Sequence, residues 1–439
     1  MSSGEAHGKG HRSRAWTLLL AFGLASCLCL ALGWWFRTGA ALAPAPAGAV
    51  SRTPVPAGRW GRLSPARQES IERLESLGYT GTGRQVQASG VTLFQAELAA
   101  PGLNLFTSGH GPVAILIDLD GRELHRWSLD FFQIWPDSGL DRDFEPTTWW
   151  RRAHLFENGD LLAIFEGQGI LKLDRNSRLI WASRNGAHHD LEVAKNGDIW
   201  VLTREARRLP RIDPDHPILE DSVSVLNAAG ELKRRFSLIE AFENSKFKSY
   251  WESSRGPKRR HPGDIFHTNS LELLDGRIAG VIPAFRDGHL LLSMRTLDTI
   301  AVVDPAVPEV VWAHRGSFIA QHDPSVLENG HLLLFDNQGP GDRSAVLELD
   351  PRTLEPIWQY RGGPDRPLCS RALGAVQRLG NGNTLITESE GGRAVEVTPR
   401  GEIVWEFFNP YRAGQDGEFI AAISEMRRLP ADFPTDWVP

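Results

Sequence analysis

Cysteine is scarce in this sequence, and its placement excludes a domain held together by disulfides. Three cysteines occur among 439 residues: Cys27 and Cys29 share one apolar run, and Cys369 stands alone in the rest of the chain. A small secreted fold stabilised by several bridges is therefore excluded. A chain of this length can instead stabilise a core by burying apolar surface.

A long basic run is also absent after the first fourteen residues. The formal net charge is −6, with 23% charged and 41% hydrophobic residues. A nucleic-acid-binding protein needs a basic face, so no nucleic-acid partner is expected. The composition is that of an ordinary globular protein and not of a disordered one.

Only one long apolar run is present, and it lies near the N-terminus. It covers residues 15–36 and follows a polar, basic segment, 1–14. About 22 residues at about 1.5 Å each span the roughly 30 Å hydrocarbon core of a membrane. Signal peptides have shorter apolar cores, so we predict a single transmembrane signal anchor with Trp34 and Trp35 at the far interface. The basic segment then stays cytoplasmic, and the rest of the chain lies on the periplasmic or extracellular side.

Two other interpretations of the N-terminus stay open. Ala41-Leu42-Ala43 has the small residues of a signal cleavage site, and Leu24-Ala25-Ser26-Cys27 resembles a lipoprotein signal. Apolar residues directly after Cys27 argue against the lipoprotein. All three interpretations place the bulk of the chain outside the cytoplasm.

The remainder divides into three segments. Residues 37–95 begin rich in alanine and proline and are predicted to be a linker with one short helix. Residues 96–412 contain an internal repeat and form the predicted catalytic domain. Residues 413–439 form a C-terminal tail, in which 419–429 has the pattern of a strand that could close a ring onto the first repeat.

The repeat occurs six times. Each unit has a tight turn followed by a β-rich apolar strand, and most units end in a strand with a tryptophan. The turns are Asp120-Gly121, Asn158-Gly159, Asn196-Gly197, Asp275-Gly276 or Asp287-Gly288, Asn329-Gly330 and Asn381-Gly382, and the terminal tryptophans are Trp127, Trp181, Trp312, Trp358 and Trp405. Asn-Gly and Asp-Gly between apolar runs predict hairpins, because both central turn residues need positive φ.

The spacing of the tryptophans predicts a β-propeller. Trp312, Trp358 and Trp405 recur about every 46 residues, the length of a four-stranded blade. Six blades close into a ring without exposed sheet edges, whereas a solenoid would leave its ends open. We therefore predict an all-β, six-bladed β-propeller preceded by a single N-terminal transmembrane helix. The tryptophans are interpreted as packing residues between blades and not as substrate ligands.

Three histidines share one position in their repeats. His189 and His322 each lie seven residues before the Asn of their first turn, and His267 lies eight residues before Asp275. The first strand of a propeller blade lines the central channel, so these three side chains should converge at one mouth of it. Turn chemistry does not explain the pattern, because the other three units have no histidine there.

The same phrases resemble the arylsulfotransferases, which are six-bladed bacterial propellers. The resemblance rests on His188-His189-Asp190, His267-Thr268-Asn269-Ser270, Leu292-Ser293-Met294-Arg295, Gln321-His322-Asp323 and the stretch 381–388. It implies transfer of a sulfuryl group from an aryl sulfate to a phenol, with no nucleotide sulfate donor, no metal and no other cofactor. The implied partners are small aryl sulfates and phenols; the oligomeric state is not predicted.

The resemblance also implies roles for individual residues. His322 matches the sulfurylated nucleophile, and His267, Asn269 and Arg295 match residues that hold the anion. His189, or its neighbour His188, matches the remaining histidine. A group whose charge spreads over three oxygens needs such cationic and hydrogen-bonding donors, and neutral imidazole is a competent nucleophile near pH 7.

Other functions are compatible with the same pattern. Three histidines with Asp190 or Asp323 could hold a divalent metal in a propeller hydrolase, although the fixed charge of Arg295 would oppose it. A membrane-anchored propeller could also be a binding module without catalysis. A quinone-dependent dehydrogenase shares the tryptophan-ended strands but needs eight blades, and six are counted here.

Overall fold

The computed structural model describes residues 87–142, 144–252, 263–316, 318–340, 343–363, 366–413, 417 and 419–438. The predicted anchor at 15–36 and most of the predicted linker lie outside these residues. Among the described residues, no helix is long and apolar enough to cross a membrane.

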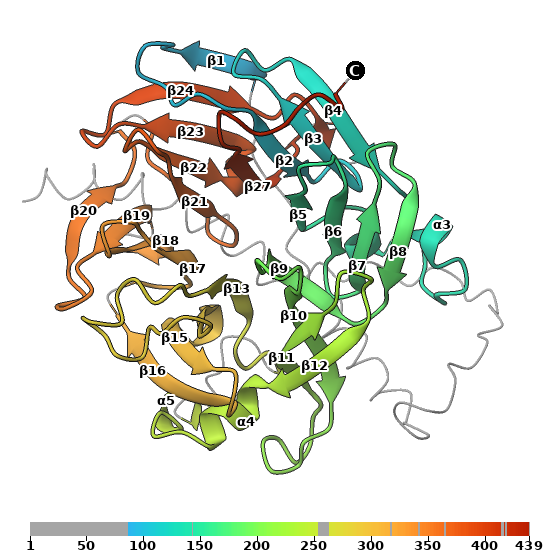
Figure 1. Ribbon diagram of the computed structural model, residues 1–439, viewed down its shortest axis with the longest axis vertical. Helices are drawn as coiled ribbons and strands as arrows, with labels where there is room; N and C mark the ends of the chain where they lie inside the picture. The colour runs from blue at the N-terminus through green and yellow to red at the C-terminus, as the bar shows by residue number, and fades with distance from the viewer. Residues whose placement is uncertain are drawn as a thin grey trace, which may run out of the picture. The chain divides into compact units, whose positions relative to one another are not determined.

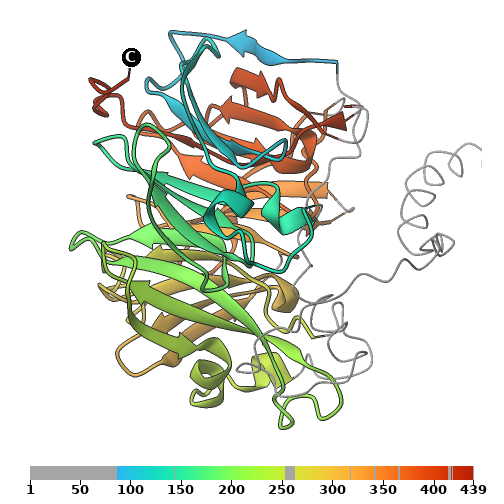
Figure 2. The ribbon, with the colours of Figure 1, turned by 90° about the vertical axis from the view of Figure 1, so that its right-hand side faces the viewer.

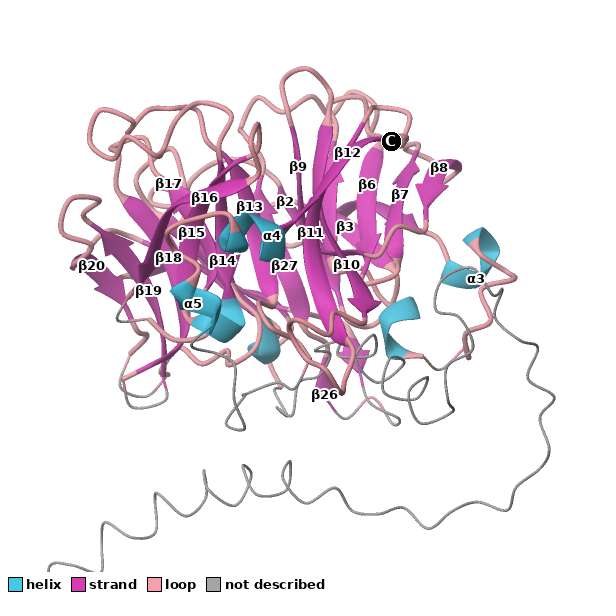
Figure 3. Ribbon diagram, turned by 90° about the horizontal axis from the view of Figure 1, so that it is seen from below, coloured by secondary structure: helices cyan, strands magenta, loops and turns pink. Residues whose placement is uncertain are grey.

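The described residues form six antiparallel sheets arranged around a common centre (Figure 1), which confirms the six-bladed propeller. Helices are few and short, and strands dominate the ribbon (Figure 3). The helical segments are α3 (Phe131–Ile134), η1 (Glu145–Thr147), α4 (Leu238–Glu243), α5 (Ser249–Glu252), η2 (Arg295–Leu297) and η3 (Ser389–Gly391).

Blades 2 to 5 each consist of four consecutive strands. Blade 2 contains β5 (Arg152–Leu155), β6 (Leu161–Phe165), β7 (Gly169–Leu173) and β8 (Leu179–Ser183). Blade 3 contains β9 (Ala187–Val193), β10 (Ile199–Arg207), β11 (Ile218–Leu226) and β12 (Leu232–Ser237). Blade 4 contains β13 (Thr268–Leu273), β14 (Leu290–Met294), β15 (Thr299–Asp304) and β16 (Glu309–Arg315). Blade 5 contains β17 (His322–Val326), β18 (Leu332–Gly339), β19 (Arg343–Leu349) and β20 (Pro356–Tyr360).

Blades 1 and 6 close the ring, and each takes a strand from the opposite end of the chain. Blade 1 contains β2 (Asn104–Ser108), β3 (Val113–Ile117), β4 (Glu123–Ser128) and, innermost, β27 (Ile423–Arg428). Blade 6 contains β21 (Ala375–Arg378), β22 (Thr384–Glu388), β23 (Arg393–Val397), β24 (Ile403–Phe408) and, outermost, β1 (Gly90–Phe94). A separate pair joins β25 (Arg412–Ala413) to β26 (Phe419–Ile420). In side view the first strands lie beside the last ones (Figure 2). Hydrogen-bonded pairing at both ends leaves no gap in the ring.

Two features of the closure lie outside the repeat pattern. β27 falls within 419–429 and completes blade 1. β1 falls within 37–95, the stretch expected to be a linker. The repeat pattern does not predict this strand, because its five residues have no turn signal beside them.

The strands are apolar on both faces because each blade is covered by two neighbours. In β6, Leu161, Ala163 and Phe165 pack toward blade 1, whereas Leu162 and Ile164 pack toward blade 3. Six clusters of buried residues result, one at each interface between neighbouring blades. A strand buried on both faces needs no alternation of polar and apolar residues.

The terminal tryptophans join one blade to the next. Their indole Nε1–H groups donate to backbone carbonyls in turns of the following blade, at 2.8–3.0 Å: Trp127 to Gly159, Trp181 to Ala228, Trp358 to Pro399 and Trp405 to Leu119. This confirms that the tryptophans are packing residues. Gly230 belongs to one such turn, where a Cβ would come within 2.6 Å of the Trp181 ring, so glycine is required there.

Candidate active site

A small pocket lies where the innermost strands of all six blades meet. Residues at or just before the start of these strands line it: Arg151, Arg152, His189, Asp190, Asn269, His322, Asp323, Gly374, Ala375, Ser424 and Glu425. Three of the residues singled out in the sequence, His189, Asn269 and His322, are among them. The shared position in the repeat therefore corresponds to a shared place in the fold.

Irregular backbone at the start of the inner strands orients these side chains. His189 and His267 have φ of 53° and 48°, in the left-handed region that residues other than glycine rarely adopt. The strand register shifts at the same points, around 188–190 in β9 and at Asn269 in β13. Bulges of this kind re-aim side chains and are common beside functional sites.

His322 is buried, and one of its ring nitrogens is fixed by Asn337 on the adjacent strand β18. His322 Nδ1 lies 2.7 Å from Asn337 Oδ1. The Asn337 amide donates from Nδ2 to the carbonyls of Ser370 and Leu373, at 2.7 and 2.9 Å, so its oxygen must face the histidine. Nδ1 of His322 therefore carries the hydrogen, and Nε2 presents its lone pair. Nε2 is buried and has no hydrogen-bond partner within the described part of the chain.

His322 is also kept neutral. Burial, followed by the positive charges of Arg295 and Arg151, lowers the pKa of His322 well below its usual value. A neutral imidazole with an unprotonated Nε2 can attack an electrophile without first losing a proton.

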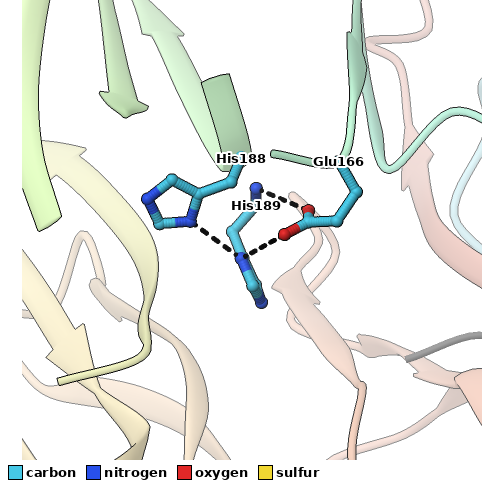
Figure 4. Close-up of side chains that lie close together, drawn as sticks. All are labelled: Glu166, His188 and His189. Carbon is cyan, nitrogen blue, oxygen red and sulfur yellow. Dashed lines mark hydrogen bonds and ion pairs between the residues drawn. The ribbon is translucent and has the colours of Figure 1, made fainter. Parts of the chain in front are cut away.

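His189 is held by Glu166, which lies just after β6 in the neighbouring blade (Figure 4). The Glu166 carboxylate accepts from the His189 backbone N–H at 3.0 Å, and its other oxygen lies 3.1 Å from His189 Nδ1. His189 Nδ1 also lies 3.0 Å from Nδ1 of His188.

A permanent charge keeps Glu166 ionised. Burial opposes ionisation, but His189 and Arg204 hold the pKa of Glu166 well below its usual value. Burial lowers the pKa of His189 to about 3, so that ring is neutral at pH 7 and Arg204, 3.2 Å from the carboxylate, supplies the lasting positive charge. Gly167 permits this approach, since a Cβ there would lie 2.7 Å from Arg204 Nη2.

His267 forms a second histidine–carboxylate pair. Its Nδ1 hydrogen-bonds to Asp264, which also accepts from the His267 backbone N–H at 3.1 Å. The His267 ring lies edge-on to His189, with centroids 4.9 Å apart. A carboxylate on Nδ1 orients a histidine and stabilises its protonated form, which suits a group that exchanges protons through Nε2.

Arg295 and Asn269 join the histidines to one another. The backbone N–H of Arg295 donates to the His267 carbonyl at 3.2 Å, and the guanidinium charge acts on His322. Asn269 donates from Nδ2 to the carbonyl of Gln321 at 2.8 Å, directly before His322. Both residues are thus anchored beside the predicted nucleophile.

Three residues named in the sequence, His188, His267 and Arg295, are not among those that line the pocket. His188 is buried beside His189, with its Nε2 3.8 Å from Asp221. Sequence reasoning also missed Arg151, Glu166, Asp264 and Asn337, which surround the histidines in space.

A comparison with known protein families identifies the family of this chain. Residues 152–410, more than half of the chain, match the family described as arylsulfotransferase (ASST). The chain belongs to the arylsulfotransferase family. The match covers β5 to β24, and with them all six residues that the sequence pointed to. A search of curated proteins gave no match to this arylsulfotransferase-family chain.

Solved structures of other propellers are similar only at a distance. A Bacteroides caccae protein of unknown function has 13% identity and a TM-score of 0.47, over 74% of this chain and 98% of that one. A streptogramin B lyase has 13% identity and a TM-score of 0.41, over 80% and 97%. The Staphylococcus aureus virginiamycin B lyase has 11% identity and a TM-score of 0.40, over 74% and 86%. Similarity this low supports no statement on function.

Proposed function

We propose that the protein is an arylsulfate sulfotransferase in which Nε2 of His322 carries the sulfuryl group between an aryl sulfate and a phenol. The observation that carries this proposal is the 2.7 Å contact between His322 Nδ1 and Asn337 Oδ1, which leaves an unprotonated Nε2 at the pocket. The low pKa of His322 supports a neutral nucleophile at neutral pH. No nucleotide donor is part of the reaction.

The groups around His322 suit an anion in transfer. Arg295 offers a permanent charge and a fork of donors, and the Asn269 amide has a second hydrogen besides the one given to Gln321. His189 is neutral and completes the pocket wall beside them. Buried donors directed at developing charge lower a barrier more than the same groups in water.

His267 is the proton carrier that we propose, since Asp264 hydrogen-bonds to its Nδ1 and orients the ring. His189 fits that role less well, because a pKa of about 3 leaves it without a proton to give near pH 7.

The reaction then balances in two steps. His322 Nε2 attacks sulfur, the bond from sulfur to the donor's phenolic oxygen breaks, and that oxygen takes a proton from His267 Nε2. The acceptor phenol returns a proton to His267 as its oxygen attacks sulfur. The electron pair of the N–S bond goes back to His322 Nε2. Water in place of the acceptor would give hydrolysis.

Steady-state kinetics test this scheme. With p-nitrophenyl sulfate as donor and phenol as acceptor, we expect the parallel double-reciprocal plots of a two-step exchange. His322→Asn should abolish nitrophenol release, whereas His216→Asn, at an exposed histidine outside the pocket lining, should leave it unchanged. Intersecting plots together with an active His322→Asn enzyme would refute the scheme.

A metal-dependent function has one observation in its favour. Glu166, His188 and His189 bring one ligand atom each within 4.8 Å of one another. Arg204 already neutralises Glu166, and the close Nδ1 atoms of the two histidines share a hydrogen, so an ion would have to displace both interactions. Unchanged activity after treatment with a chelator would exclude this alternative, and loss restored by zinc would support it.

We also propose that the catalytic domain lies on the periplasmic or extracellular side, tethered by residues 15–36. The support is the apolar run behind a basic segment in the sequence. A fusion of residues 1–95 to a reporter enzyme that is active only outside the cytoplasm should be active. An inactive but expressed fusion would contradict export.

A further inference from the structure

Arg151 is a buried arginine that forms no ion pair with a carboxylate among the described residues. It lies immediately before β5, is 5% exposed and lines the pocket together with His189 and His322. Its Nε has no hydrogen-bond partner among the described residues. The only contact recorded for its guanidinium in this part of the chain is a long one, 3.5 Å, from Nη1 to the carbonyl of Ser424.

Other arginines near the pocket differ from Arg151, because each forms an ion pair with a carboxylate. Arg152 pairs with Asp190 at 3.0 Å and also with Glu425. Arg427 pairs with Asp323 at 2.7 Å, and Arg204 with Glu166 at 3.2 Å. Glu166, Glu425 and Asp190 act on the charge of Arg151 without forming an ion pair with it, and burial lowers its pKa. A buried guanidinium without a direct ion pair is unfavourable, so the pocket beside Arg151 suits a negatively charged ligand.

Arg151 also occupies the repeat position of the site histidines. It lies seven residues before Asn158, as His189 precedes Asn196 and His322 precedes Asn329. Blade 2 thus supplies an arginine where blades 3, 4 and 5 supply histidines, and blade 6 has Gly374, without a side chain, at this point. The position alone directs Arg151 to the centre of the ring.

The charge of Arg151 reaches both pocket histidines. It contributes, after burial and Arg295, to the low pKa of His322, and after burial it is one of the charges that act on His189. Because Arg151, His189 and His322 line the same pocket, the guanidinium lies beside the place where the transferred group would be bound.

We propose that Arg151 is a second arginine that binds the oxygens of the transferred sulfuryl group, in addition to Arg295. The inference rests on the proposed function for the identity of the anion. It assigns an anion-binding role to a residue outside the part of the chain that matches the family. Two fixed cations would hold the three sulfuryl oxygens while His322 exchanges one phenol for another.

Binding of inorganic sulfate, measured by calorimetry on the full-length protein without any donor, tests this proposal. Arg151→Met should weaken sulfate binding at least about tenfold, and Arg151→Lys should weaken it less, since a point charge remains. Melting temperature provides the second measurement. Arg151→Met should melt no lower than the wild type, because it removes a buried charge that forms no ion pair among the described residues. Arg152→Met should melt lower, because it leaves Asp190 without its ion pair and Glu425 with Arg427 alone.

Wild-type affinity for sulfate in both Arg151 variants, or no sulfate binding by the wild type at all, would overturn the proposal. A melting temperature of Arg151→Met as low as that of Arg152→Met would also overturn it, by showing a structural role. A failure of the proposed sulfuryl transfer can be distinguished from a failure of the proposed anion site. If the wild type formed no sulfuryl adduct but lost sulfate binding on Arg151→Met, the anion site would stand and the transfer would not.

Discussion

His322 Nδ1 and Asn337 Oδ1 lie 2.7 Å apart, and the Asn337 amide nitrogen donates to two carbonyls. His322 Nδ1 must therefore be the donor in this hydrogen bond and the Asn337 oxygen the acceptor. It turns the Nε2 lone pair of His322 toward a pocket to which all six blades contribute. The proposed chemistry depends on this relationship more than on any other.

Replacing Asn337 should therefore impair the nucleophile. Asn337→Leu is expected to slow adduct formation about 10- to 100-fold, because His322 can then adopt the wrong tautomer. It should also cost about 1–3 kcal/mol in unfolding free energy, since the Leu373 carbonyl loses its donor and the Ser370 carbonyl keeps only the Ser344 hydroxyl. Single-turnover kinetics and chemical denaturation measure the two effects.

Ser344→Ala is the matched control for Asn337→Leu. Its hydroxyl donates to the carbonyls of Asn337 and Ser370 without touching His322. It should lower stability by a similar order and leave the rate unchanged. Equal rate losses in both variants would mean that the effect comes from local destabilisation and not from the tautomer.

Loss of the Asp264 carboxylate should show its effect only with poor leaving groups. Asp264→Asn removes the carboxylate that orients His267 through its Nδ1, so transfer from phenyl sulfate, which needs a proton from His267, should fall about 10²- to 10⁴-fold. Transfer from p-nitrophenyl sulfate should change little, because nitrophenolate leaves without a proton. An equal loss with both donors would contradict the assignment of His267 as the proton donor.

The rate of adduct formation should be insensitive to mild acid. Burial and the charge of Arg295 lower the pKa of His322, so the nucleophile stays neutral as the pH falls through 6.5. With p-nitrophenyl sulfate, the single-turnover rates at pH 5.5 and 7.5 should agree within about twofold. A decline that follows an apparent pKa near 6.5 would show that His322 titrates as an ordinary histidine.

The same shift has a consequence for stability. His188, His189 and His322 have folded-state pKa values below that of an unfolded histidine. Below pH 6.5 these histidines bind protons in the unfolded chain but not in the folded chain. The free energy of unfolding therefore decreases as the pH falls below 6.5. Circular dichroism at each pH separates this unfolding from a change in rate.

The tryptophan contacts between blades can be tested on matched positions. Trp358→Phe removes the indole N–H that donates to Pro399 at 2.8 Å and should cost about 0.5–1.5 kcal/mol beyond the lost packing. Trp312 occupies the same position in blade 4 and is also partly buried, and no bond from its indole to the next blade is observed among the described residues. Trp312→Phe therefore measures the packing loss alone, and an equal cost in both variants would contradict a role for the indole bond.

The sequence predicted the fold because each blade repeats the same local signals. Turns that need positive φ and tryptophan-ended strands recur at one spacing, and burial on both faces explains the continuous apolar runs. β1 escaped prediction because its pairing with β24 is set by ring closure and by no repeated signal.

The sequence predicted the site only in part. His189 and His322 could be found because a shared repeat position becomes a shared place in the ring. Arg151 has the same position and was missed because only histidines were sought there. Glu166 and Asn337 have no such signal, since they lie outside the inner strands and reach the histidines only through the packing of the blades.

The most direct test of the account is the mass of the protein after brief exposure to p-nitrophenyl sulfate without acceptor. We expect a gain of one sulfuryl group, located by peptide mapping on the peptide that contains His322 and removed by added phenol. The adduct should be absent in His322→Asn and unaffected by a chelator. An adduct on another residue, or nitrophenol release with no adduct in a trapped sample, would contradict transfer through His322.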